Sequence, residues 1–94
     1  MEVDVLLEKG LELLSKHPEL LQNMGAMELG LMPNIKFPTM GGEVLWNDLA
    51  EYNGWRVQRN SVTGHCRILD PEDVRHAWGG ETAIMDFFKK IVKD

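Results

Sequence analysis

Residues 54–70 read GWRVQRNSVTGHCRILD, and this stretch decides the class of fold that the sequence predicts. On both sides of Gly64, apolar and polar side chains alternate, which is the pattern of two β-strands that each bury one face. The glycine itself suits the left-handed backbone conformation that closes many hairpin loops. We therefore predict an antiparallel β-hairpin over residues 55–69.

The register of this hairpin follows from its loop. Val62 and Thr63 are β-branched and resist the positive φ angles of a two-residue turn. A three-residue loop would place Arg59 opposite Arg67, which sets two like charges against each other. A four-residue loop, 61–64, avoids this conflict and separates the side chains into two faces. The apolar face then carries Trp55, Val57, Cys66 and Ile68. The polar face carries Arg56, Gln58, Asn60, His65 and Arg67.

The rest of the chain reads mostly as helix. Apolar residues recur at helical spacing, and Pro18 and the Gly79-Gly80 pair supply boundaries. Asp70 followed by Pro71 has the form of a helix start, with a capping acid and a proline in the first position. We expect helices over residues 3–16, 18–24, 43–52, 70–78 and 81–93.

Residues 25–42 are rich in glycine and proline, which argues against a long helix. The alternation at residues 34–37 permits a short third strand at the edge of the sheet, ended by Pro38. The sequence therefore predicts a single α+β domain over residues 1–94, with about five helices packed against one antiparallel β-hairpin.

Composition limits the class of protein. Hydrophobic residues make up 44% and charged residues 27% of the chain, as in ordinary globular domains, and the net charge is −5. No apolar run approaches the ~20 residues that span a bilayer, so we expect no membrane partner. A single cysteine, Cys66, and a first segment without a basic signal-peptide region predict a cytoplasmic protein.

The sequence contains no motif for catalysis, a metal or a cofactor. No pair of cysteines or histidines has metal-ligand spacing, and no glycine-rich stretch matches a nucleotide-binding loop. His65 and Cys66 are neighbours in a predicted strand and would point to opposite faces, so they form no nucleophile–base pair. We therefore expect no catalytic residues, no metal and no cofactor.

Charge is distributed unevenly along the chain. Residues 1–52 contain nine acidic and three basic residues, whereas residues 55–69 contain three arginines and no acid. Guanidinium groups favour carboxylate and phosphate partners. Our first hypothesis is a non-enzymatic protein that binds an acidic protein or a small anion. The binding residues would be Arg56, Gln58, Asn60, His65 and Arg67 on the polar hairpin face.

We expect both Arg56 and Arg67 to stand in solvent on this polar face without supporting the core, so replacing both by alanine should leave stability nearly unchanged. Two other functions stay open. The second hypothesis is a small enzyme or ligand-binding domain with a cleft near Trp55, His65 and His76, in which a histidine reaches a carboxylate. A winged-helix nucleic-acid binder is disfavoured, because the predicted helix 43–52 is acidic. Unpaired hairpin edges also leave self-association into a homo-oligomer open.

Overall fold

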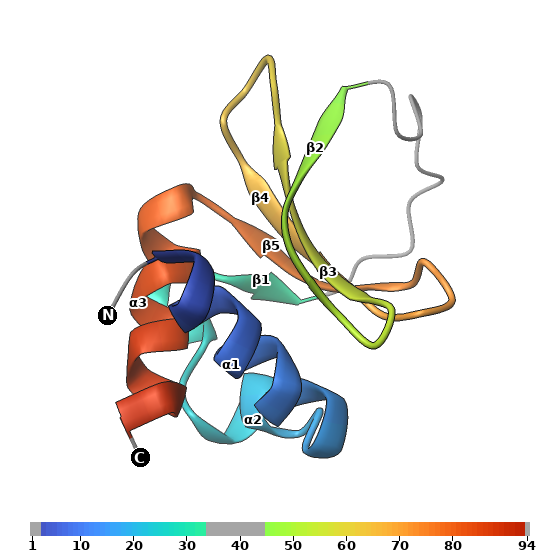
Figure 1. Ribbon diagram of the computed structural model, residues 1–94. Helices are drawn as coiled ribbons and strands as arrows, with labels where there is room; N and C mark the ends of the chain where they lie inside the picture. Colours follow the sequence, from blue (N-terminus) through green and yellow to red (C-terminus); the bar gives the residue numbers. More distant parts are fainter. Residues whose placement is uncertain (1–2, 34–44, 94) are drawn as a thin grey trace.

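A computed structural model describes residues 3–33 and 45–93 of the chain. Its helices are α1 (Val3–Lys16), α2 (Leu20–Asn23), the 3₁₀ turn η1 (Met27–Leu29) and α3 (Glu81–Lys93). Its strands are β1 (Met32–Pro33), β2 (Trp46–Tyr52), β3 (Trp55–Asn60), β4 (Cys66–Leu69) and β5 (Arg75–Gly79). The strands form one antiparallel sheet in the order β1-β5-β4-β3-β2. Helices α1 and α3 lie together beside one face of this sheet (Figure 1).

The α+β class is confirmed, but the predicted count of helices is wrong. Within residues 3–33 and 45–93, α1 and α3 are the long helices, and α2 is a single turn. The predicted helices at 3–16 and 81–93 are present, whereas those at 43–52 and 70–78 are replaced by strands. The hairpin is therefore the centre of a larger sheet. The edge strand expected at 34–37 lies outside the described residues, and β1 pairs with β5 just before it. No helix in the described part of the chain has the length and apolar character needed to cross a membrane.

The register of the β3–β4 hairpin agrees with the prediction. Val57 pairs with Ile68, and Gln58 pairs with Arg67. The loop closes where the Asn60 N–H donates to the His65 carbonyl over 2.7 Å. Gly64 ends the loop with φ 78°, in the left-handed region that glycine tolerates best. Hairpin turn chemistry and alternation were sufficient to fix this part of the fold.

The segment predicted as helix 43–52 is strand β2, and residues 43–44 lie outside the described part of the chain. Tyr52 pairs with Trp55 across a two-residue turn, Asn53-Gly54, in which both residues have positive φ (49° and 87°). Asn-Gly is the preferred sequence for such a type I′ turn. A bulge between Asp48 and Ala50 breaks the two-residue alternation of β2. The apolar residues of the strand therefore have a spacing that is typical of a helix.

The segment predicted as helix 70–78 is a tight loop followed by β5. The Asp70 carboxylate accepts hydrogen bonds from the backbone N–H groups of Glu72 (2.8 Å) and Val74 (2.9 Å). A capping acid before proline is common to helix starts and to turns of this kind. Here Asp73 adopts φ 63°, which turns the chain out of the helical path, and the Asp70 N–H donates to the Val74 carbonyl over 3.0 Å.

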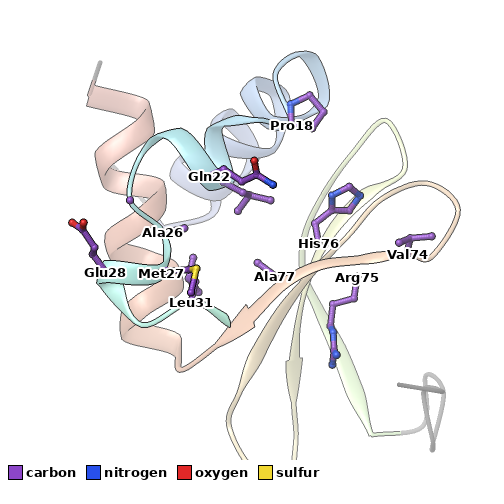
Figure 2. A pocket seen from close by; sticks show the side chains of 12 residues that line it. Pro18, Gln22, Ala26, Met27, Glu28, Leu31, Val74, Arg75, His76 and Ala77 are labelled. Atoms are coloured by element: carbon purple, nitrogen blue, oxygen red, sulfur yellow. The ribbon is translucent and has the colours of Figure 1, made fainter. Parts of the chain in front are cut away.

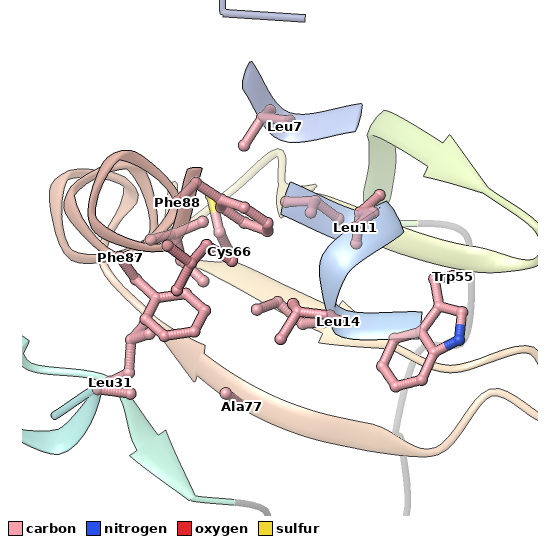
Figure 3. Close-up of a cluster of buried hydrophobic side chains, with 14 of the residues drawn as sticks. Leu7, Leu11, Leu14, Leu31, Trp55, Cys66, Ala77, Phe87 and Phe88 are labelled. Atoms are coloured by element: carbon pink, nitrogen blue, oxygen red, sulfur yellow. The ribbon is translucent and has the colours of Figure 1, made fainter. Parts of the chain in front are cut away.

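The hydrophobic core lies between the two long helices and the apolar face of the sheet (Figure 3). The apolar hairpin face is buried as predicted, with Trp55 7% exposed and Val57, Cys66 and Ile68 fully covered. Helices α1 and α3 approach closely at Gly10, where an added Cβ would overlap the ring of Phe88. The other buried residues include Leu7, Leu11, Leu14, Leu31, Ile84 and Phe87.

Candidate functional site

The residues of the predicted polar hairpin face lie on the side of the sheet opposite the two long helices. Two of them are buried: Gln58 is 2% exposed and Arg67 is 5% exposed. Arg67 Nε donates to Gln58 Oε1 over 2.9 Å, and Gln58 Nε2 donates to Asp48 Oδ1 over 2.8 Å. The Arg67 guanidinium stacks 4.0 Å from the centre of the Trp46 ring. The expectation that Arg67 stands in solvent is therefore wrong.

The other three residues of this face have different surroundings. Arg56 forms an ion pair with Asp73 in the β4–β5 loop, and its side chain is 17% exposed. Asn60 Oδ1 accepts hydrogen bonds from two N–H groups of the 61–64 loop (2.8 and 2.9 Å) and thereby stabilises the turn. His65 is exposed, with its ring 6.0 Å from that of Trp78. Binding of an acidic partner by these five residues stays a prediction.

A groove of about 610 Å³ lies on the other side of the molecule, between the α2–η1 segment and β5 (Figure 2). Most of its lining is apolar. These apolar residues are Pro18, Leu21, Ala26, Met27, Leu31, Val74 and Ala77. The polar side chains among its lining residues are Gln22, Glu28, Arg75 and His76. Its walls come from segments far apart in the sequence, so no local pattern marks it.

His76 brings a hydrogen-bonding ring to this groove. Its imidazole lies on the side of β5 that faces Pro18, whereas the Arg75 side chain points to the opposite side (Figure 2). His76 Nε2 is 2.9 Å from Asp70 Oδ2, and the ring packs against Trp55 with a centroid separation of 4.9 Å. The second hypothesis placed a cleft near Trp55, His65 and His76. The structure brings Trp55 and His76 together and places His65 elsewhere.

Asp70 holds the ring of His76 in position as an ionised carboxylate. Partial burial raises the pKa of Asp70, but hydrogen bonds from His76 and from the N–H groups of Val74 and Glu72 outweigh it and lower the pKa below its ordinary value. An ionised carboxylate accepts hydrogen bonds and donates none, so His76 Nε2 must carry the proton between them. Sequence reasoning missed this pair because Asp70 has the pattern of a helix cap.

The remaining ring nitrogen, His76 Nδ1, has no hydrogen-bond partner among residues 3–33 and 45–93. The groove thus combines an apolar surface with an imidazole ring that Asp70 holds in place. Its described lining includes no serine, threonine or cysteine, and Cys66 is buried in the core, where burial raises the pKa of the thiol. Such a site can bind and orient a ligand, and it supplies no side-chain nucleophile of these types.

Asp70 also makes stability depend on pH. Because the folded-state pKa of Asp70 is lowered, its stabilising effect is complete above the unfolded pKa and is lost as the pH falls through the folded pKa. We expect Asp70→Asn to lower the free energy of unfolding by about 1 kcal/mol at pH 7. Urea denaturation at descending pH should show this difference shrinking below about pH 4.

Exposed Glu72 in the same loop gives a matched control for the Asp70 prediction. Glu72→Gln should change stability by less than about 0.5 kcal/mol at pH 7. A difference between Asp70→Asn and the unsubstituted protein that stays constant down to acid pH would contradict a linked carboxylate.

Comparisons of the chain with protein-family models, with curated proteins and with solved structures return no match. In the described part of the chain, no three histidine, cysteine, aspartate or glutamate side chains come together as a potential metal site. The geometry of the groove and of the hairpin face is therefore what indicates a function.

Proposed function

We propose that this protein is a non-enzymatic binding domain whose groove beside His76 holds a small, largely apolar ligand. The observation that carries the proposal is the position of an oriented imidazole at the wall of an apolar groove. Small-molecule sites commonly have volumes of about 300–1,000 Å³ and combine apolar lining with a few placed polar groups. At 610 Å³, the groove falls within this range. The single, buried cysteine supports a reducing, cytoplasmic setting for this function.

The hairpin face supports a binding function less well than the groove does. Its arginines have structural partners: Arg67 lies under Trp46, Arg56 pairs with Asp73, and the neighbouring Arg59 lies 3.6 Å from Glu81. An anion would have to compete with these carboxylates for the guanidinium groups. We therefore prefer the groove over the acidic-partner hypothesis.

Fragment screening by two-dimensional NMR tests the proposal. We expect small aromatic compounds to shift the backbone amides of groove residues such as Leu21 and Ala77, with millimolar or tighter affinity. Gln22→Trp should fill the groove and abolish these shifts, since Gln22 is an exposed residue in its lining. Asn23→Trp is the matched control, because Asn23 is also exposed on α2 but does not line the groove.

The control variant should bind the fragments as the unsubstituted protein does. Fragment shifts that cluster on the hairpin face around His65, with none in the groove, would contradict the proposal and favour the first hypothesis.

A further inference from the structure

We infer that the ligand carries one acidic group, a carboxylate or sulfonate, which binds His76 Nδ1 while the apolar part of the ligand lies along Leu21 and Ala26. This inference rests on the proposed function of the groove and names the chemical class of its ligand.

Asp70 and its hydrogen bonds hold one side of the His76 imidazole ring. Asp70 uses both carboxylate oxygens, Oδ1 for the N–H groups of Glu72 and Val74 and Oδ2 for His76. A ligand that covers His76 would remove water from the ring, which is costly for an imidazolium without a counter-charge. The carboxylate at 2.9 Å supplies that counter-charge. In its protonated form, the ring donates from Nδ1 to an acid and forms a charge-assisted hydrogen bond.

The two ends of the groove carry different charged side chains. Glu28 lies at the end of the groove remote from His76 (Figure 2). Its carboxylate repels an acidic group at that end, whereas the Asp70 carboxylate at the other end is paired with His76 Nε2 over 2.9 Å. A ligand with one acidic group therefore has its lower-energy orientation with that group at His76 and its apolar part over the floor of the groove.

One competing cation lies near the Glu28 end of the groove. A Cβ added at Gly25 would lie 3.4 Å from both Lys90 Nζ and Glu28 Oε2, so the ammonium and the carboxylate both approach the same backbone position. His76 differs because its partner Asp70 leaves one ring nitrogen available. The two positions can be separated by experiment, since an acid bound at Lys90 would perturb Gly25 and leave His76 unchanged.

Two isosteric probes, 1-naphthylacetate and 1-naphthylacetamide, separate charge from shape. Both should shift groove amides of the full chain in NMR titrations, because they share the naphthyl ring. We expect the acid to bind roughly tenfold more tightly than the amide, the difference that one charge-assisted hydrogen bond provides. In the unsubstituted protein, the ¹⁵N resonance of His76 Nδ1 should move on addition of the acid and much less on addition of the amide.

Two variants complete the test. His76→Gln should remove the preference for the acid and leave binding of the amide within about twofold. His65→Gln is the control, because His65 is exposed outside the groove, and it should change neither affinity.

The outcomes distinguish the inference from the proposed function. If both probes bind the groove with equal affinity, or if the acid shifts Gly25 and leaves His76 Nδ1 unmoved, the acidic-ligand inference is wrong and the groove remains a binding site. If neither probe shifts any groove amide, the proposed function is wrong and the inference falls with it.

Discussion

Replacing Arg67 by alanine should lower the free energy of unfolding by about 3 kcal/mol. The variant leaves Gln58 Oε1 buried without its 2.9 Å hydrogen bond from Arg67 Nε. It also removes the planar group on which the Trp46 ring rests at 4.0 Å, together with the packing of the arginine stem. Urea denaturation followed by circular dichroism measures the loss.

Two further variants show that burial and geometry cause this effect. Arg67→Lys should recover less than half of the lost stability, because lysine keeps the charge but has neither the fixed donor for Gln58 nor the planar stacking surface. Arg59→Ala is the matched control, since this arginine is exposed and its ion pair with Glu81 spans 3.6 Å. It should cost less than about 1 kcal/mol. A loss for Arg67→Ala as small as the loss for Arg59→Ala would show that the Arg67 side chain is solvated and has no structural role.

The contrast between Arg67 and Gly64 shows what the sequence could predict. Gly64, its four-residue loop and the pairing of Val57 with Ile68 follow from local turn chemistry and alternation, and all are present. Arg67 was placed on the correct face of the hairpin for the same reason. Its burial was not predictable from the sequence. Trp46, which covers it, lies in β2, and the sequence pattern of β2 predicted a helix.

Strands β2 and β5, which the sequence predicted as helices, share one physical cause. In β2 a bulge places Leu49 and residue 50 side by side against the core, which breaks the two-residue period on which strand prediction depends. In β5 the register of the pairing with β4 shifts between Ile68 and Leu69, which interrupts the two-residue period there as well. The Asn53-Gly54 sequence is typical of a type I′ turn and could have predicted the β2–β3 hairpin.

The groove was less predictable than the sheet. His76 was a candidate from its residue type, and Asp70 was recognised as a capping acid, but their contact depends on the β4–β5 loop turning back at Asp73. The opposite wall comes from α2 and η1, about fifty residues earlier in the chain. Sequence spacing carries no information about an approach of this kind, because tertiary packing decides it.

Gly10→Ala should lower the free energy of unfolding by about 2–3 kcal/mol, although helix propensity alone would predict a gain of about 1 kcal/mol. Gly10 is buried in the middle of α1, and its backbone lies against the fully buried ring of Phe88 from α3. An added Cβ would overlap that ring. The ring is fully buried, and protein cores are close-packed, so α1 and α3 must separate or Phe88 must leave its preferred rotamer.

Thermal and urea denaturation of three variants isolate this packing effect. Gly80→Ala is the control, because a Cβ there meets no atom within 4 Å, and it should cost less than about 1 kcal/mol. Combining Gly10→Ala with Phe88→Leu should cost less than the sum of the two single substitutions, since the smaller leucine makes room for the new methyl group. Additive losses would mean that Gly10 and Phe88 do not share the contact on which the packing of α1 against α3 depends. A Gly10→Ala variant more stable than the unsubstituted protein would show that helix propensity, and not the close approach of the two helices, governs this position.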